Sequence, residues 1–215
     1  MIRVIAGVNG AGKSSIAGSA IKAAGGSYYN PDEEAQRLRQ QWPERDAAEI
    51  NAAVWAEGVR RLRTAIEADH DFTFETTLGG STIANLLLDA ISRGVRVAVW
   101  YCGLASPEQH IARVAARVAR GGHAIPEAKI RQRWRSSMRN LCRLVAVCAE
   151  VAVYDNSLEL DPSGRPQLRR LLHKRDGAWV APPALASMPA WARPVAAVCL
   201  GAEIPKSDEE QGSKR

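Results

Sequence analysis

The stretch IAGVNGAGKSSIAG (residues 5–18) holds four glycines, two serines and a lysine close to the amino terminus, where a domain ordinarily places core residues. It contains Gly-x-x-x-x-Gly-Lys-Ser over residues 7–14, which is the P-loop pattern. The apolar run at residues 3–6 predicts a strand before the pattern, and the small residues 14–24 predict a helix after it. Strand, glycine loop and helix in this order predict a phosphate-binding segment.

The chemistry of such a loop explains its composition. Glycines let the backbone turn so that its N–H groups point at phosphate, and the positive end of the following helix adds to the attraction. Lys13 would reach the outer phosphates, and the Ser14 hydroxyl would hold Mg²⁺. We therefore expect ATP or GTP with Mg²⁺, and Ser14 as a metal ligand. The candidate nucleotide-binding residues of the loop are Gly7, Asn9, Gly10, Ala11, Gly12, Lys13, Ser14 and Ser15.

Beyond the loop, strand-like runs alternate with helical patterns. Further strands are predicted to end at Tyr29 and to cover residues 72–77, 95–101 and 151–154. Helices are predicted over residues 47–68, 81–93, 106–120 and 126–149. This alternation predicts an α/β P-loop kinase-like three-layer sandwich, with a mostly parallel five-stranded sheet, helices on both faces and ligands at the carboxyl ends of the strands. A hairpin is predicted at residues 169–181, turning about Asp176-Gly177.

Polar residues follow several of these strands. Asn30-Pro31-Asp32 ends the second predicted strand and is interpreted as a turn. Glu75, Thr76 and Thr77 end the run at 72–77, where strand propensity explains the threonines but not the glutamate. Asn156 follows the strand at 151–154 and joins the candidate nucleotide-binding residues. Because parallel strands end at one edge of the sheet, these clusters are expected near the P-loop.

Positive charge is concentrated in one segment. Residues 113–143 hold eight arginines and one lysine against the single acid Glu127, a local charge of +8 in a chain of net charge +6. Arg113, Arg117 and Arg120 share one helix face, and we expect Arg120 to contact nucleotide. The segment at about residues 106–149 is predicted to form a helical lid over the phosphates. In its second helix Arg133 points away from the stripe formed by Arg131, Arg135 and Arg139.

Composition bounds the class of protein. With 215 residues, 46% hydrophobic and 24% charged, we expect one P-loop kinase-like domain over residues 1–200 and a disordered tail over 201–215. No apolar run approaches the roughly 18 residues of a membrane span, so we expect a cytoplasmic protein with no membrane partner. The four cysteines form no CxxC pair, which favours reduced thiols over a metal cage.

These features favour a kinase. Phosphoryl transfer needs a phosphate cradle, cations for the developing charge, and a carboxylate that orients or deprotonates the acceptor hydroxyl. We therefore expect an ATP/Mg²⁺-dependent phosphotransferase acting on a hydroxyl of a small molecule. Two alternatives stay open: a kinase for another acceptor, such as a nucleoside or an antibiotic, and an NTP-dependent switch that binds nucleic acid. Nucleic acid is the less favoured partner, because the arginine helices lack interleaved aromatic residues apart from Trp134.

The chain also resembles a known family. GVNGAGKSS, NPD, FETTL, RVAARVARGGHAIPE and YDNS, in this order over residues 3–157, are similar to the zeta toxin family of short P-loop kinases. Zeta toxins phosphorylate a hydroxyl of UDP-N-acetylglucosamine, and the resemblance implies that acceptor and an antitoxin partner. It further implies that Asp32 is the catalytic base, that Glu75 and Thr77, with the intervening Thr76, touch substrate, and that Arg117 and Arg133 act with Lys13 on the ATP phosphates.

Overall fold

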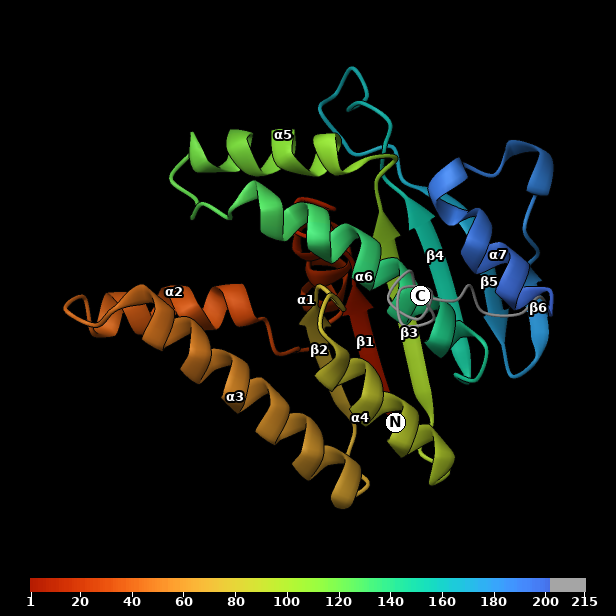
Figure 1. Cartoon of the computed structure of the whole chain (residues 1–215), viewed down its shortest axis with the longest axis horizontal. Helices are drawn as coiled ribbons and strands as arrows, with labels where there is room; N and C mark the ends of the chain where they lie inside the picture. Colours follow the sequence, from red (N-terminus) through yellow and green to blue (C-terminus); the bar gives the residue numbers. More distant parts are fainter. Residues whose placement is uncertain (202–215) are drawn as a thin grey trace, which may run out of the picture.

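A computed structural model describes residues 1–201 of the chain (Figure 1). The strands are β1 (Ile2–Ala6), β2 (Phe72–Thr76), β3 (Val97–Gly103), β4 (Glu150–Asp155), β5 (Arg169–Arg175) and β6 (Ala178–Ala181). The α-helices are α1 (Ser19–Ala23), α2 (Pro31–Gln41), α3 (Ala47–Glu67), α4 (Ser81–Ser92), α5 (Pro107–Val118), α6 (Glu127–Val145) and α7 (Arg193–Cys199). Short helical turns are η1 (Ser14–Gly18, a π-helix), η2 (Leu185–Ser187) and η3 (Ala190–Ala192). The tail predicted for 201–215 lies, after Gly201, outside the described residues.

One sheet contains the strands of residues 1–201, in the order β2-β1-β3-β4-β5-β6. The first four strands are parallel, and Ile2 of β1 lies opposite both Phe72 of β2 and Val97 of β3. β5 and β6 are antiparallel additions at the far edge. The predicted α/β P-loop fold with a mostly parallel sheet is confirmed.

The sheet has six strands among the described residues, rather than the predicted five, because both edges differ from expectation. Tyr29 makes an isolated parallel bridge to Phe74 and does not end a strand. The predicted hairpin is confirmed and joins the sheet through β4. Asp176 and Gly177 have φ values of 48° and 80°, as a two-residue hairpin turn requires.

Four predicted helices are confirmed, a fifth is divided into two short helices, and one segment predicted as a turn is a helix. The predicted helices at 47–68, 81–93, 106–120 and 126–149 correspond to α3, α4, α5 and α6, with ends that move by up to four residues. The predicted helix at 14–24 is η1 followed by α1. The interpretation of residues 30–32 as a turn is wrong, because α2 begins there with Asn30 as its N-cap and Pro31 as its first residue.

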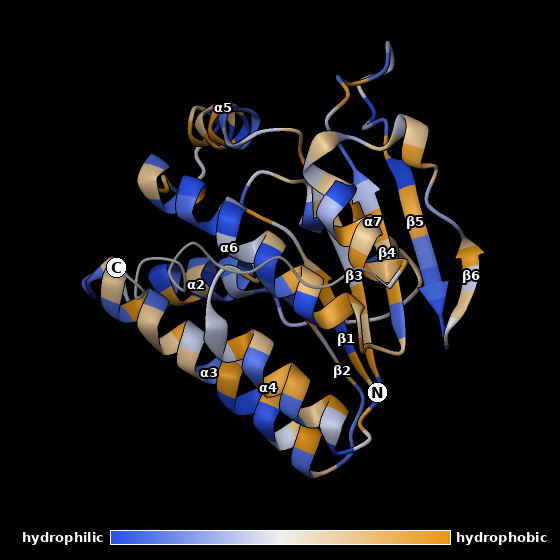
Figure 2. Cartoon of the chain, turned by 45° about the vertical axis from the view of Figure 1, so that its right-hand side comes forward, coloured by the Kyte–Doolittle hydropathy of each residue, from blue (hydrophilic) through white to orange (hydrophobic). Residues whose placement is uncertain are grey.

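The helices form layers around the sheet (Figure 1). α3, α4, α6 and α7 cover one face and share a core with it, and α1 lies on the opposite face. Figure 2 colours β1, α4 and α7 largely as hydrophobic, in keeping with this core. α5 and α6 extend over the carboxyl ends of the parallel strands, where the P-loop also lies. No helix within residues 1–201 is long and apolar enough to cross a membrane.

Candidate active site

The P-loop turns tightly between β1 and η1, against two neighbouring segments. Gly7 has φ +143°, and a Cβ there would lie 2.2 Å from the Cys102 carbonyl oxygen of β3. Gly12 has φ +93°, and a Cβ there would lie 2.7 Å from Asn156 Nδ2. Both positions therefore need glycine, because a side chain would strain the backbone and displace its neighbours. The loop is thus held by β3 and by the segment after β4.

Glu75 connects β2 to the P-loop. Its Oε2 accepts a hydrogen bond of 2.8 Å from Ser14 Oγ, and its Oε1 lies 3.4 Å from Lys13 Nζ. The side chains of Lys13 and Glu75 are each only 6% exposed. The carboxylate therefore compensates a buried lysine charge that has no other acid beside it among the described residues.

The oxygens of Ser14 and Glu75 suit a hard cation. Mg²⁺ takes oxygen ligands and keeps several waters, so one or two protein groups suffice beside the phosphates of a nucleotide. Within residues 1–201 no group of three His, Cys, Asp or Glu side chains could hold a metal by itself. The residues present fit Mg²⁺ held jointly with phosphate better than a protein metal cage.

A cleft of about 710 Å³ opens between the P-loop, α5 and the segment after β4. It brings together most of the predicted site residues, among them Asp32 and Glu75. Those that line it are Asn9, Gly10, Gly12, Lys13, Ser14, Ser15, Asp32, Glu75, Arg117, Arg120 and Asn156. A larger hollow of about 1180 Å³ lies beneath α1 on the other face of the sheet and contains none of the residues 7–15.

Asp32 is presented by the first turn of α2. The Asn30 side chain accepts hydrogen bonds from the backbone N–H groups of Asp32 and Glu33, which fixes the start of the helix. The Asp32 carboxylate lies 3.7 Å from Arg117 Nη1 and 3.8 Å from His123 Nε2. Burial lowers the pKa of His123, with Asp32 acting in the opposite direction. The carboxylate thus faces the predicted lid across the cleft.

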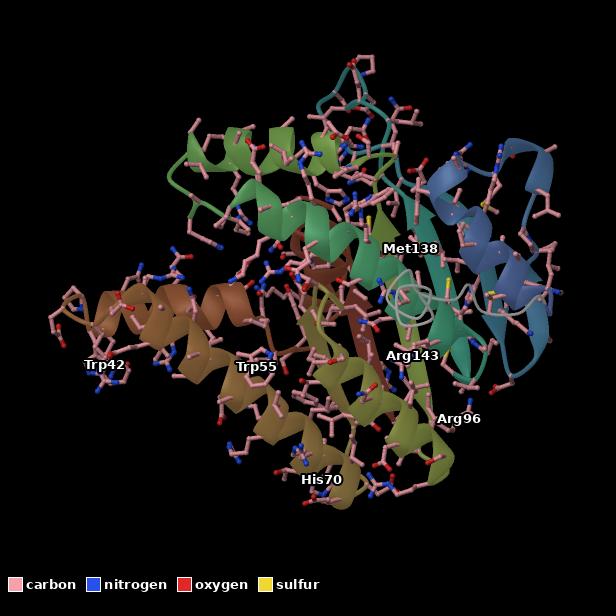
Figure 3. All side chains as sticks on the ribbon, viewed as in Figure 1. Trp42, Trp55, His70, Arg96, Met138 and Arg143 are labelled. Atoms are coloured by element: carbon pink, nitrogen blue, oxygen red, sulfur yellow. The ribbon has the colours of Figure 1, made fainter. Side chains whose placement is uncertain are left out.

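The arginines of the predicted lid point in several directions. Arg117 has a buried Nε with no hydrogen-bond partner among the described residues, beside the cleft. Arg133 donates to Asn9 Oδ1 at 2.8 Å, and burial lowers its pKa. Arg131 pairs with Glu108 at 2.5 Å, and Arg143 donates to Asn85 of α4, away from α5 (Figure 3). The positive charge of the sequence is therefore divided between the cleft and other surfaces.

Other predicted residues lie beside the cleft without lining it. Thr76 Oγ1 and Thr77 Oγ1 accept hydrogen bonds from the N–H groups of Leu78 and Gly79, so they shape the loop after β2. The Ala11 carbonyl accepts hydrogen bonds from Asn156 Nδ2 and Cys102 Sγ. These contacts fix the two loops on either side of Lys13.

Several residues of the site were not found from the sequence. Gln109, Arg113, Leu158 and Leu160 also line the cleft. His110, 1% exposed, donates from Nδ1 to the Asn9 carbonyl at 2.8 Å and ties α5 to the P-loop. Burial lowers its pKa to about 4, although the hydrogen bond to Asn9 opposes that shift. For Gln109, His110 and Arg113 the sequence signal is their place on the helix that begins at Ser106, where Arg113 shares a face with Arg117. Leu158 and Leu160 follow β4 and carry no such signal.

Comparison with known proteins gives the family of the chain. Residues 2–141 match the family model described as AAA domain. An uncharacterized protein of Haemophilus influenzae is 33% identical over 128 residues, which are 60% of this chain and 88% of that protein.

Solved structures share the fold at low identity. A chain of the native AvrRxo1-ORF1:AvrRxo1-ORF2 complex has a TM-score of 0.63 at 13% identity, covering 86% of this chain and 62% of that one. For the same complex with ATP the TM-score is 0.59 at 13% identity, covering 96% and 66%. A structure from the PezAT toxin-antitoxin system of Streptococcus pneumoniae has a TM-score of 0.53 at 13% identity, covering 98% and 80%. This chain therefore spans less than two thirds of the first of these chains, and what it shares with the three structures is the α/β P-loop fold.

Proposed function

This chain belongs to the AAA domain family whose model it matches, and we propose that it is an Mg²⁺-dependent kinase that transfers the terminal phosphoryl group of ATP to a hydroxyl of a small molecule. The observation that carries the proposal is the lining of one cleft by the P-loop, by Asp32 and by Arg117 and Arg120. Phosphoryl transfer asks of a protein a phosphate cradle, positive charge and a carboxylate near the acceptor. The cleft contains all three.

Each group has a role that follows from its position. The P-loop backbone and Lys13 would bind the phosphates, and Arg117, which lines the cleft and whose Nε has no partner among the described residues, would donate to a phosphate oxygen. Asp32 accepts the proton of the acceptor hydroxyl as that oxygen attacks phosphorus. Arg117 and His123, both within 4 Å of the carboxylate, keep it oriented toward the cleft. Arg133 acts on the phosphates through Asn9, whose side chain it holds.

Glu75 and Ser14 complete the phosphate side. Their oxygens would help to hold Mg²⁺ beside the nucleotide, and the ion would supply positive charge to the phosphoryl oxygens. Ser14 would ligate the ion, and Glu75 would orient the Ser14 hydroxyl and compensate Lys13. Glu75 also borders the space next to Asp32, so contact with the acceptor, as the resemblance to zeta toxins implies, is part of the proposal.

For the acceptor we propose UDP-N-acetylglucosamine. The motifs shared with zeta toxins support this choice. The fold shared with a structure of the PezAT toxin-antitoxin system agrees with the toxin resemblance but says nothing of the acceptor. An antitoxin is the corresponding partner. A nucleoside or an antibiotic is the alternative acceptor, and a panel of acceptors distinguishes them.

The roles of Asp32 and Lys13 are separable by measuring ATP binding and product formation together. In Asp32→Asn we expect transfer to fall by about a hundredfold or more while ATP affinity stays near wild type, because a general base acts on the acceptor. In Lys13→Ala both quantities fall. Glu34→Gln removes a carboxylate from the same turn of α2 whose charge pairs with Arg37, and it should behave as wild type. Equal loss of ATP binding in Asp32→Asn and Lys13→Ala would mean that Asp32 has a structural role only.

A further inference from the structure

One buried side chain of the cleft has an unused hydrogen-bond acceptor. Asn156, at 3% exposure, donates from Nδ2 to the Ala11 carbonyl at 2.9 Å. Its Oδ1 is buried and has no partner within residues 1–201. Since the Ala11 oxygen can only accept, the amide cannot be reversed to satisfy Oδ1 instead. A buried acceptor without a partner is unfavourable, which points to a donor supplied by a ligand.

The surroundings of Asn156 suit a planar base. Beyond the P-loop the cleft is lined by Leu158, Leu160 and Pro166 from the segment after β4, opposite Ala112 and Ala116 of α5. Leu158 and Leu160 are 49% and 59% exposed, and both line the cleft, so they offer it an apolar wall. Ligand sites combine such apolar walls with a few placed polar groups. The walls lie next to the phosphate cradle, where the base of a bound nucleotide would extend.

The backbone carbonyl oxygens of residues 156–158 already accept hydrogen bonds, so they do not compete with Asn156 Oδ1 for a donor on the base. Arg113 Nη2 donates to the carbonyl oxygens of Asn156 at 2.6 Å and of Leu158 at 3.3 Å. Gln109 Nε2 donates to the Ser157 carbonyl at 3.4 Å. Side chains of α5 therefore donate hydrogen bonds to three consecutive carbonyl oxygens, and these bonds fix the position of the segment. Asn156 Oδ1 is left as the acceptor that a base can use.

We propose that Asn156 selects adenine over guanine, with its Oδ1 accepting a hydrogen bond from the exocyclic amino group of adenine. Guanine carries an acceptor oxygen at the corresponding ring position, so two acceptors would face each other. This inference rests on the proposed function, since it assumes that the cleft binds a nucleoside triphosphate. It gives Asn156 a role in selecting the ATP already proposed as donor, beyond holding the P-loop.

The test compares nucleotides on the unmodified protein. Equilibrium binding is measured with Mg²⁺ and ATP, GTP or purine riboside triphosphate, which lacks the amino group. We expect ATP to bind about tenfold or more tightly than GTP, with the purine analogue also weaker than ATP, because only ATP satisfies Oδ1. Equal affinity for ATP and GTP would overturn the inference and leave the proposed function standing. Absence of binding by all three would overturn both.

Two variants test whether the preference for ATP over GTP depends on Asn156. Asn156→Ala should bring the ratio of ATP to GTP affinity toward one. Asn140→Ala is the matched control, because Asn140 is also buried and donates to two backbone carbonyls, those of Leu78 and Gly80, away from the cleft. It should keep the wild-type ratio. An unchanged ratio in folded Asn156→Ala would overturn the assignment, and should that variant fail to fold, the nucleotide series on the wild type decides.

Discussion

At the scale of single residues, the site depends on side chains whose burial leaves them few partners. Lys13 and Glu75 compensate each other at 3.4 Å, and each is 6% exposed. Removing one of such a pair leaves a buried charge uncompensated. The P-loop pattern in the sequence predicts the place of Lys13, but not its pairing with Glu75. Glu75 lies 61 positions after Ser14, the neighbour of Lys13, and it reaches the P-loop only because β2 lies beside β1.

Alanine substitutions at two glycines distinguish the effect of backbone strain from the effect of a steric clash in the site. Gly12→Ala and Gly25→Ala both place a Cβ at positive φ, +93° and +75°, which costs about 1–2 kcal/mol of stability in either case. Only at Gly12 would the Cβ also meet Asn156 Nδ2 at 2.7 Å, whereas nothing lies within 4 Å at Gly25. We expect ATP affinity to fall in Gly12→Ala and to stay at the wild-type value in Gly25→Ala, as measured by calorimetry. Wild-type binding by Gly12→Ala would contradict the tight approach of the two loops.

His110 predicts a pH dependence of stability. Its folded pKa of about 4 lies below the ordinary value of 6.5, so the unfolded chain binds the proton more readily. Stability from this group is therefore full above about pH 6.5 and falls as the pH drops toward 4. Between pH 7.5 and 5 the loss is about 2 kcal/mol in the free energy of unfolding. Urea titrations of His110→Asn, which keeps a donor for the Asn9 carbonyl, should show a dependence smaller by that amount, and an unchanged dependence would exclude His110 as its source.

At the scale of elements, the sequence predicts most helices, and α2 shows why one was missed. Asn30, Pro31 and the acids that follow are a helix start: an N-cap, a proline at the first position and negative charge in the first turn. In the sequence, a proline after two tyrosines equally indicates the end of a strand, so the pattern does not distinguish the two. The edge strands β5 and β6 flank a clear turn signal at Asp176-Gly177, but the pairing of β5 with β4 depends on tertiary packing.

The N-cap of α2 is predicted to serve both stability and chemistry. Asn30→Ala removes the acceptor for two backbone N–H groups and should lower the free energy of unfolding by about 1 kcal/mol. Asp46 caps α3 in the same way, so Asp46→Ala should cost a similar amount. Only Asn30→Ala should also lower the rate of phosphoryl transfer at saturating ATP, because α2 carries Asp32. Equal transfer rates in the two variants would show that the position of Asp32 does not depend on this cap.

At the scale of the whole molecule, the sheet order brings the separate motifs together. β1, β2 and β4 end at one edge, so the P-loop, Glu75 and Asn156 meet there (Figure 1). Residues of α5 line the cleft from the other side of the P-loop. The fold class and this edge could be predicted from alternating strands and helices. Which arginines face the cleft could not, because Arg133 and Arg143 find partners on distant segments. A single domain over residues 1–200 and closure of the lid stay predictions.

The measurement that tests the central claim most directly is the mass of the products formed from Mg²⁺ and ATP with UDP-sugars and nucleosides. We expect UDP-N-acetylglucosamine to gain one phosphate in the presence of the wild-type protein and to stay unmodified with Asp32→Asn. A phosphate gained by another acceptor, lost in the same variant, would keep the kinase and change its substrate. ATP hydrolysis at one rate with or without any acceptor, unchanged in Asp32→Asn and with no acceptor modified, would contradict a phosphotransferase.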